Sequence, residues 1–325
     1  MKLLHTSKAT GQTRDITGLM TQVTWSGDQA SIPRKLEGTI AFREGGGLPE
    51  PAPGDLLSLS EGTERLIDAL VVRRQAGSEE HTMDLSGLDY GFYLKRNDYT
   101  GKHRTQSPEA ITRAVCAARG IPVAALPVTG VTLSRKFSGT PLTNVIQTLW
   151  SLAAEQTGER YAIRYTPAGL LVKVKTVARE SLIIRGKSNL MDATTTESIE
   201  NMVNRVAVYD KNGSLLRTLG TEDDQALYGV MEQHVTQAEG EDAAGEARRL
   251  LEDGALAQTV TINMLGDLRC VTGETVAVEE TATGLTGIFW IDGDVHTWKL
   301  GQYYTRLTLN CRNVMASASA GSELE

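Results

Sequence analysis

The sequence predicts an α+β protein, mainly β, in which two similar antiparallel β-barrel-like domains flank an inserted region of helices and a hairpin. The first observation is a C-terminal meander, residues 273–310, rich in β-branched and aromatic residues. The second is a similar meander near the start, residues 54–86. Both open on a glycine followed by an acid, Gly54-Asp55 and Gly273-Glu274, and reach their second strand after a similar interval. This recurrence predicts an internal duplication. The expected strands are Gly54–Leu59, Ala69–Arg73, His81–Ser86, Glu274–Val278, Gly287–Val295 and Tyr303–Asn310.

The composition is that of an ordinary globular chain. With 325 residues, 40% of them hydrophobic and 22% charged, it is long enough for two or three packed domains. The net charge of −7 argues against a broad basic face that would grip nucleic acid. No apolar run approaches the roughly 20 residues of a membrane span, and the polar start lacks a signal-peptide core. We therefore expect a soluble chain made in a cytoplasm.

Four segments are expected along the chain. The domain boundaries predicted from the sequence are 1–100 for the N-terminal β-barrel-like domain, 101–200 for the α+β insert with two helices and a hairpin, 201–315 for the C-terminal β-barrel-like domain with one helix, and 316–325 for a flexible tail of small and polar residues.

Before the first meander the pattern predicts two strands and a loop. Loose alternation favours strands at Met20–Trp25 and Leu36–Phe42. The glycines of Gly45–Gly47 and three following prolines disfavour both helix and sheet. No helix with a Lys-Ser or Lys-Thr pair follows these glycines, so a phosphate cradle is not expected.

The insert carries two well-marked helices. Ser107 is an expected N-cap with Pro108 at the first helical position, and Gly120 ends the element. The second helix is expected to open in the same way at Thr140-Pro141 and to end at Gly158. Trp150 lies beside its apolar stripe, where packing is the favoured interpretation over ligand stacking.

The rest of the chain is read from alternation and turn residues. The expected elements are a hairpin at Tyr161–Tyr165 and Leu170–Lys175, a strand at Val203–Tyr209, a loop over 221–227, a helix at Glu239–Leu251 weakened by two glycines, and a strand at Thr259–Asn263.

The three cysteines, Cys116, Cys270 and Cys311, are far apart and odd in number. Without a Cys-x-x-Cys pair they predict neither a zinc site nor a disulfide framework. Buried thiols are the favoured interpretation.

The best candidate for a metal site is the segment Asp292-Gly-Asp294-Val-His296, flanked by Trp290 and Trp298. On a strand its three possible ligands would lie in a line, about 6.7 Å apart per step, and could not surround one ion without a bend. Because Asp-Gly-Asp is also ordinary turn chemistry, a scaffold turn is favoured over a metal centre.

Glu197 and Glu200 are the nearest approach to an acid/base pair. Nothing in the sequence predicts a cleft around them, so a solvated polar turn is favoured over a glycosidase pair. No histidine occurs in a known zinc spacing, and no nucleophile elbow is present. The sequence therefore predicts no catalytic, cofactor-binding or metal-binding residue and no cofactor.

Specific blocks of residues resemble the XkdQ/YqbQ-type phage tail proteins, relatives of the central hub proteins of contractile-tail baseplates. The resemblance runs from about Trp25–Asp28 to the end of the last strand, and its most specific block is Ser198–Val206. In the first meander it is weaker, because Ile67 and Ala69 stand where the family usually has an aromatic residue and a glycine. The other matching blocks are Asp89 with Tyr93-Leu94 and Asn97, Ser107–Ile111, Gly120–Pro122, Thr129-Gly130, Thr157–Tyr161, Gly284–Gly287, Phe289–Ile291 and His296-Thr297.

This resemblance implies a structural role without enzymatic activity. A homotrimer would place two like barrels per chain in a ring, adapting a sixfold tail tube to a threefold spike in a phage tail or tailocin baseplate. The implied partners are further copies of the chain, the tail tube protein, the central spike protein and baseplate wedge or LysM-type tail proteins, with no membrane and no direct nucleic-acid readout. The implied location is the virion tail, assembled in the cytoplasm of a host bacterium.

Two alternatives stay open. A tail-associated peptidoglycan hydrolase module would need a carboxylate pair such as Glu197 and Glu200 in a deep cleft. A carbohydrate-binding β protein would use Trp290 and Trp298.

Overall fold

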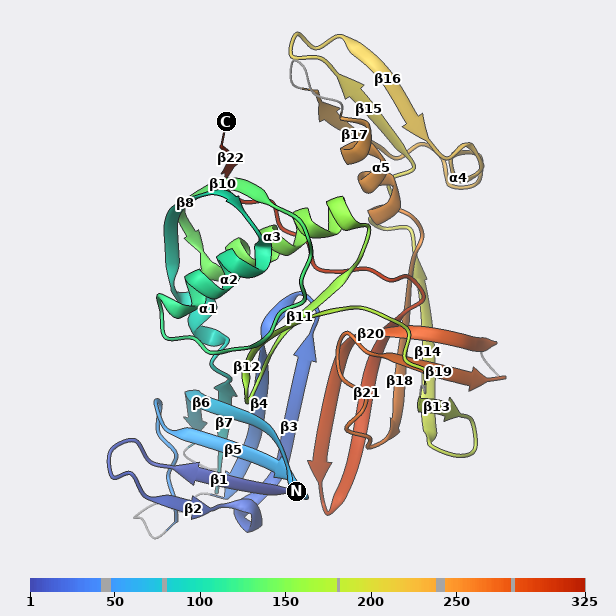
Figure 1. The fold of residues 1–325 in the computed structure, drawn as a ribbon. Helices are drawn as coiled ribbons and strands as arrows, with labels where there is room; N and C mark the ends of the chain where they lie inside the picture. Colours follow the sequence, from blue (N-terminus) through green and yellow to red (C-terminus); the bar gives the residue numbers. More distant parts are fainter. Residues whose placement is uncertain (42–47, 78–80, 180–181, 238–242, 282–283, 325) are drawn as a thin grey trace. The chain divides into compact units, whose positions relative to one another are not determined.

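The strands predicted at the two ends of the chain come together in one broad sheet of a computed structural model (Figure 1). The prediction of an α+β fold, mainly β with antiparallel sheets, is confirmed. The structure describes residues 1–41, 48–77, 81–179, 182–237, 243–281 and 284–324. The glycines at 45–47, which the sequence places in a loop, lie outside the described residues.

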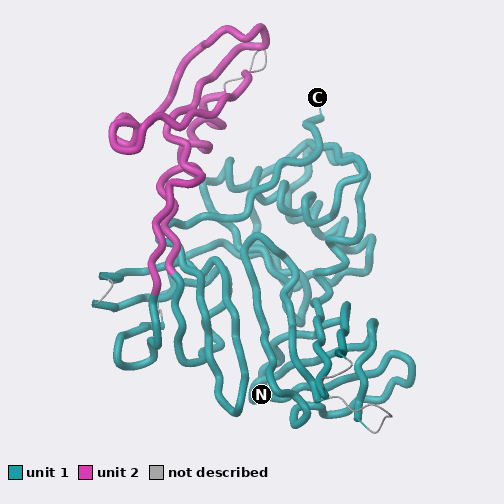
Figure 2. The backbone as a smooth tube through the Cα atoms, turned by 180° about the vertical axis from the view of Figure 1, so that it is seen from behind, with its two compact units in different colours: residues 1–193, 261–325 teal, residues 194–260 magenta. Residues whose placement is uncertain are grey.

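The chain divides into two compact units (Figure 2). Unit 1 contains Met1–Ala193 and Thr261–Glu325, and unit 2 contains Thr194–Val260. Boundaries at residues 100, 200 and 315 therefore do not coincide with these units, and the proposed barrel domains stay a prediction.

The first copy of the repeat is a five-stranded sheet with the order β3-β4-β7-β6-β5. Its strands are β3 (Met20–Asp28), β4 (Ser31–Ala41), β5 (Leu56–Glu61), β6 (Glu64–Ala76) and β7 (Thr82–Leu88). Beyond β5 the sheet continues into β1 (Lys2–Thr6) and β2 (Thr13–Asp15), and a short 3₁₀ turn η1 (Thr17–Leu19) leads into β3. Its apolar face is buried around Leu36, Leu59 and Val71.

The second copy repeats this order as β14-β18-β21-β20-β19. Its strands are β14 (Leu190–Ser198), β18 (Ala257–Leu265), β19 (Thr275–Glu280), β20 (Leu285–Lys299) and β21 (Gln302–Asn310). The outer strand β13 (Leu182–Arg185) pairs parallel to β19, where the first copy has β1 antiparallel to β5. Strand order and direction along the chain thus match over all five strands.

The long middle strand of each copy has the same internal geometry. In β6, Leu70 pairs with Leu56 on one edge and Leu88 on the other, and a bulge follows between Val71 and Arg73. In β20, Trp290 pairs with Thr275 and Asn310 in the same manner, and a bulge follows between Ile291 and Gly293. A bulge bends a strand and re-aims its side chains, so its recurrence at the same step is a detailed match.

The glycine–acid pairs also make the same turn in both copies. Gly54 has φ +96° and donates from its N–H to the Val71 carbonyl at 2.9 Å, while Gly273 has φ +90° and donates to Ile291 at 2.8 Å. Such positive φ values favour glycine. The recurrence predicted from the two meanders is therefore confirmed at the level of single hydrogen bonds.

The copies differ at one hairpin. β3 and β4 are joined by the two residues Gln29-Ala30, whereas β14 and β18 are joined by residues 199–256, most of unit 2. Unit 2 is thus an insertion at a hairpin tip, where added chain is tolerated best.

A single strand pairing joins the two copies. β3 of the first copy runs antiparallel to the second half of β20, from Asp28 opposite Gly293 to Gln22 opposite Lys299. We call this pairing the seam. Because of it, strands of both copies form one continuous 13-stranded sheet within the described residues.

The α+β region between the copies packs its helices around Trp150, Phe137 and Tyr161. Its elements are α1 (Phe92–Arg96), β8 (Asp98–Gln106), α2 (Pro108–Ala117), β9 (Val123–Ala125), β10 (Leu133–Pro141), α3 (Leu142–Thr157), β11 (Tyr161–Thr166) and β12 (Gly169–Val174). Ser107 caps α2 as predicted, accepting from the Ala110 N–H at 3.3 Å. Thr140 makes no such cap, because it belongs to β10 and Pro141 occupies the N-cap.

Unit 2 is a three-stranded sheet with α5 on its apolar side, where Ala247 contacts a core of Val206, Val208 and Val235. The strand order is β16-β15-β17, with β15 in the middle. Its elements are β15 (Arg205–Tyr209), β16 (Leu215–Gly220), α4 (Glu222–Tyr228), β17 (Glu232–Thr236) and α5 (Ala244–Asp253).

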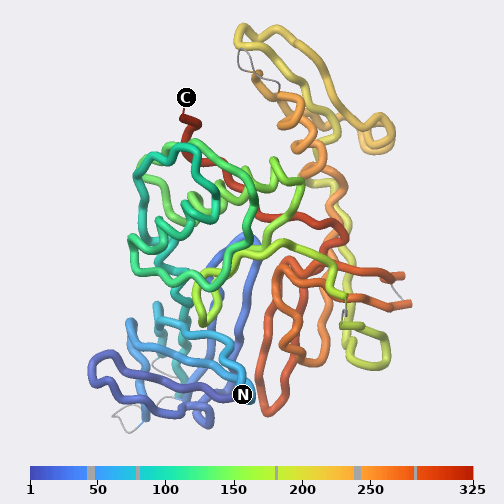
Figure 3. The backbone as a smooth tube through the Cα atoms, viewed as in Figure 1, coloured from blue at the N-terminus to red at the C-terminus, as the bar shows by residue number. Residues whose placement is uncertain are grey.

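The loop predicted over 221–227 is wrong. Residues 221–227 form most of α4 rather than a loop, because three acids in the first turn stabilise the helix N-terminus. The helix expected over Glu239–Leu251 is present as α5, and residues 239–242 of that prediction lie outside the described residues. In the tail, β22 (Ser322–Glu323) pairs with β10 and Ala320 accepts from Arg135 at 2.9 Å, so this segment returns to the α+β region (Figure 3). The flexibility of the tail stays a prediction.

Candidate functional site at the seam between the two sheet copies

A buried ion pair crosses the seam. Arg34 on β4 and Asp294 on β20 are 3% and 0% exposed, and the guanidinium donates to both carboxylate oxygens, at 3.1 Å to Oδ1. Thr272 adds its backbone N–H at 2.7 Å and its hydroxyl at 2.6 Å to Oδ1. A buried charge is tolerated when its partners and hydrogen bonds are complete, as they are for this carboxylate.

The charge of Asp294 is secured by these neighbours. Burial alone would raise the pKa of Asp294, but the Arg34 charge and hydrogen bonds from His296 and Arg34 outweigh it and hold this pKa well below its usual range. The pair is therefore ionised at neutral pH.

His296 lies beside the pair and is fully buried. Its Nε2 is 3.0 Å from the Cys270 carbonyl, which can only accept, and 3.2 Å from Asp294 Oδ2. We therefore assign the proton to Nε2, which leaves Nδ1 to accept from the Tyr303 hydroxyl at 2.7 Å. Every ring nitrogen has a partner within the fold, so this histidine is a structural connector between β20 and β21.

Trp25 on β3 closes the seam from the first copy. The Arg34 guanidinium lies 4.0 Å from the centre of its ring, within cation–π range. The His296 ring of the second copy lies 4.8 Å from the Trp25 ring, centre to centre. The indole thus holds groups of both copies together.

Asp89 supports Arg34 from the end of β7. Its carboxylate accepts from the backbone N–H groups of Arg34 and Gly91, both at 2.9 Å. Burial raises the pKa of Asp89 to about 7, against the smaller lowering by those hydrogen bonds and the Arg34 charge. The pKa values of the two carboxyl groups around Arg34 are therefore shifted in opposite directions, that of Asp89 upward and that of Asp294 downward.

The structure corrects the interpretation of the Asp292–His296 segment. It is not a turn: it lies inside the single 15-residue strand β20, which has a bulge at Asp292. The three side chains have different partners, since Asp292 accepts from Asn310 at 3.0 Å whereas Asp294 and His296 belong to the seam. Across the described ranges, no group of three His, Cys, Asp or Glu side chains is arranged to hold a metal ion.

The other sequence candidates are dispersed. Glu197 lies at the end of β14, where it accepts from Gln258 at 3.2 Å, and Glu200 follows the strand on the surface. Cys116 and Cys270 are buried, but Cys311 is exposed because it follows the last residue of β21. Trp150 is fully buried and donates to Thr112 at 3.2 Å, so its packing role is confirmed.

Arg34 was missed by the sequence reasoning, although its signal is readable. On β4 it shares a face with Ile32 and Leu36, both buried, so an arginine interrupts an apolar alternation at a two-residue period. A charged residue at such a position predicts a buried partner of opposite sign.

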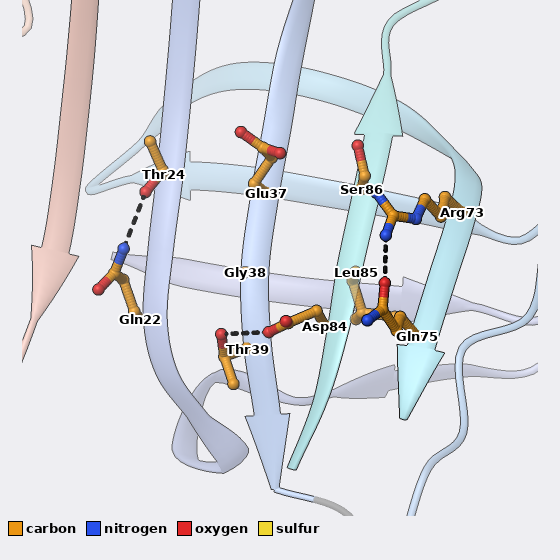
Figure 4. A pocket seen from close by; sticks show the side chains of 10 residues that line it. All are labelled: Gln22, Thr24, Glu37, Gly38, Thr39, Arg73, Gln75, Asp84, Leu85 and Ser86. Atoms are coloured by element: carbon orange, nitrogen blue, oxygen red, sulfur yellow. Dashed lines mark hydrogen bonds between the residues drawn. The ribbon is translucent and has the colours of Figure 1, made fainter. Parts of the chain in front are cut away.

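A second candidate is a polar groove on the outer face of the first copy (Figure 4). Its cavity volume is about 290 Å³, and it is lined from β3, β4, β6 and β7. Thr39 donates to Asp84 at 2.7 Å inside it, and Arg73 contacts Gln75 at its border (Figure 4). In the sequence this face can be recognised from polar residues at every second position of a strand, such as Gln22 and Thr24 on β3.

A family profile described as YQBQ-like matches residues 23–310. The chain belongs to the YQBQ-like family. No curated protein matches.

Solved structures share the fold over nearly the whole chain. The 43 kDa tail protein of prophage MuSo2 from Shewanella oneidensis is 14% identical with a TM-score of 0.74, covering 95% of this chain and 98% of that one. A tail protein from Neisseria meningitidis MC58 is 13% identical with a TM-score of 0.68, covering 97% and 98%.

A more distant similarity reaches a secretion-system protein. The E. coli c3393 protein, a component of the type VI secretion system with structural similarity to the bacteriophage T4 tail proteins gp27 and gp5, is 10% identical with a TM-score of 0.56. The similarity covers 93% of this chain and 76% of that one. At these identities the comparisons show the fold.

None of the described helices is both long and apolar enough to cross a bilayer.

Proposed function

We propose that this YQBQ-like chain is the structural central hub of a contractile phage tail or tailocin baseplate. It acts as a homotrimeric ring that adapts a sixfold tail tube to a threefold spike. Its partners are further copies of itself, the tube protein, the spike protein and wedge or LysM-type tail proteins. It resides in the virion tail and is assembled in the host cytoplasm.

The observation that carries the proposal is the duplication of the five-stranded sheet. Strand order, bulge position and the glycine–acid turn recur in the two copies. Two like copies in each of three chains give a ring of six similar sheets, which matches sixfold symmetry on one side and threefold symmetry on the other. Membership of the YQBQ-like family and the fold shared with prophage tail proteins support the same role.

The seam fits a scaffold rather than a catalyst. Asp294 and His296 are fully buried, and the partners of His296 are all protein groups. A catalytic acid or base must reach a substrate, and neither of these side chains can. We therefore propose that the protein has no enzymatic activity.

The decisive experiment is the mass of the purified chain in solution across a concentration series, followed by electron microscopy of the particles. We expect trimers whose class averages show a ring with six density lobes. A chain that stays monomeric at every concentration and forms no ring would overturn the hub proposal.

The enzymatic alternative has its own test. Purified protein is applied to peptidoglycan in a gel and in suspension, beside the Glu197→Gln and Glu200→Gln variants. We expect no clearing by any of them. Clearing by the wild-type protein that disappears in the variants would replace the hub proposal with a hydrolase.

A further inference from the structure

We propose that β14 of one chain pairs antiparallel with residues 73–76 of β6 in a second copy, repeating between chains the β3–β20 seam within each chain. The inference rests on the proposed trimeric hub and identifies the strand edges that close it. The partner is a second copy of this chain, held by main-chain hydrogen bonds and one exposed charge pair.

Both edges are open in the single chain. β19 pairs with β20 as far as Trp290, and beyond that residue the same edge of β20 pairs with β3. β5 likewise pairs with β6 as far as Leu70, but beyond that residue no described strand pairs with this edge of β6. At the other end of the 13-stranded sheet, β14 has a neighbour only on the side of β18 within the described residues. Within the described residues, β14 and the second half of β6 therefore each have one unpaired edge.

The duplication assigns each edge its role. β14 occupies the place of β3, and both strands are nine residues long. Counted from the shared bulge, Arg73 and Arg74 occupy the places of Gly293 and Asp294. Since β3 pairs with β20, the equivalent pairing joins β14 with β6, and these two edges can only meet between different chains.

The seam also predicts where the charges lie. Gly27 is opposite Asp294, and the Arg34 guanidinium fills the space beside Gly27, 2.2 Å from where a Cβ would lie. The equivalent of Gly27 at the end of β14 is Glu197, so Arg74 of one chain would lie opposite Glu197 of the next. In the seam the anion Asp294 is on the middle strand β20 and its cation Arg34 reaches it from β4, whereas in the proposed contact the cation is on the middle strand β6 and the anion is on β14.

These groups are exposed in the single chain. Arg74 and Glu197 both lie on the surface, and no described residue forms an ion pair with either. β14 is a nine-residue edge strand with Thr194-Thr195-Thr196 at its centre, and it has no lysine or proline along its length. Lysine and proline are common protection of an edge against pairing, so their absence favours a partner strand, and the exposed Glu197 favours a partner that brings a cation.

Repeating the contact gives a head-to-tail interface. A head-to-tail contact closes into a ring when its rotation allows, and three chains would alternate the internal seam with the proposed one. The polar groove of Figure 4 would then continue onto the next chain, because Arg73 and Gln75 lie at its border on β6.

The test is a charge exchange on the full-length protein. Arg74→Glu and Glu197→Arg should each raise the dissociation constant of the trimer by about tenfold or more, because like charges then oppose across the edge. The double variant should restore it. Lys102→Glu, at an exposed position on β8, is the matched control and should leave assembly unchanged. Thermal unfolding by circular dichroism checks that every variant folds.

A designed disulfide tests the register. Gln75→Cys with Thr196→Cys, the pair equivalent to Val295 opposite Ser26, brings Cα atoms within bonding range in an antiparallel ladder. Cys311→Ser is included because Cys311 is the exposed native thiol. On oxidation we expect covalent dimers and trimers that disappear on reduction and are absent from each single-cysteine protein.

The outcomes separate the two proposals. A wild-type trimer with unchanged assembly in both charge variants and no cross-link would overturn the β14–β6 contact and leave the hub proposal intact. A wild-type monomer without cross-linking would overturn both. Loss of assembly in the single variants, restored in the double variant and accompanied by the cross-link, would establish the contact.

Discussion

The two copies of the five-stranded sheet share a path but differ in what their edges meet. In the second copy the late half of β20 is covered by β3, and Asp294 is fully buried against Arg34. In the first copy the equivalent half of β6 is open, and Arg74 at the place of Asp294 is exposed. The same strand arrangement thus has a paired edge on β20 and, within the described residues, an unpaired edge on β6. The comparison shows how a duplicated fold can keep its bulge and turns while its edge residues diverge.

The copies also differ at the hairpin between their first two strands. The first copy closes with Gln29-Ala30, while the second holds most of unit 2 there. Charge follows this division: by residue count unit 2 has 13 acids and 5 basic residues, a net charge of −8, so unit 1 has +1 out of the total of −7. Unit 1 therefore has nearly balanced charge, and the acidic surplus belongs to unit 2.

The largest expected difference between the copies is the loss of unfolding free energy when alanine replaces Asp294 in one copy or the equivalent Arg74 in the other. Asp294→Ala leaves the buried Arg34 charge without its partner, so we expect a loss of about 3–5 kcal/mol in the free energy of unfolding. Arg74→Ala removes an exposed side chain at the equivalent place and should change it by less than ~0.5 kcal/mol in the monomer. Urea unfolding at low protein concentration measures both. Equal effects would contradict the distinction between a closed and an open edge.

The second prediction separates the two carboxyl groups that hold Arg34. The pKa of Asp89 is raised to about 7, so the folded state binds this proton more tightly than the unfolded state does. Its contribution is fully present below about pH 4 and is lost as pH rises to about 7, amounting to about 2–4 kcal/mol. Asp294 has a lowered pKa, and its contribution is instead lost as pH falls below about 4.

The Asp89→Asn variant tests the predicted direction of the pH dependence of stability. Its amide has no carboxyl proton to lose, so the decline of unfolding free energy between pH 4 and pH 7 should flatten. The measurement is urea unfolding at four pH values in that window. A variant that keeps the full wild-type slope would show that another group titrates there.

Much of the fold could be predicted because the duplication repeats local signals. The glycine–acid turns and the β-branched strands around them are local, and both meanders were found from them. β13, β14 and β16 were not predicted, since their residues are largely exposed and show no apolar alternation. β22 in the tail was not predicted for a related reason. Its small and polar residues give no local strand signal, and its place depends on a close approach to β10, where a Cβ on Gly321 would lie 2.3 Å from the Lys136 carbonyl oxygen.

The site was only half predictable. Asp294 and His296 were singled out together, and both do belong to the seam. Their partner Arg34 comes from β4, 260 residues from Asp294 along the chain, and Thr272 comes from the turn before β19. A contact of that separation depends on the β3–β20 pairing, which no local pattern reveals.

The third prediction compares the two glycines of the repeated turn. Both have φ near +90°, so alanine should cost about 1–2 kcal/mol at either place. At Gly54 a Cβ meets only the Lys8 side chain at 3.7 Å, whereas at Gly273 it would lie 2.6 Å from the Ala162 Cβ. Gly273→Ala should therefore lose about 1 kcal/mol more than Gly54→Ala. Thermal unfolding of the two variants in parallel decides this, and an equal loss would show that the neighbour at 162 moves freely.

The smallest effect is expected from making the second hairpin like the first. Replacing residues 199–256 by Gln-Ala would join β14 to β18 by the same two-residue turn that joins β3 to β4. The core residues of unit 2 contact one another and form their own cluster. The remaining chain should therefore unfold cooperatively, with a free energy within ~1 kcal/mol of the wild-type sheet, since closing a shorter loop costs slightly less entropy. Hydrogen exchange of β18 and β21 amides measures this directly. If their protection collapses, the second copy depends on its insertion for folding, and the two copies are less alike than their strand order indicates.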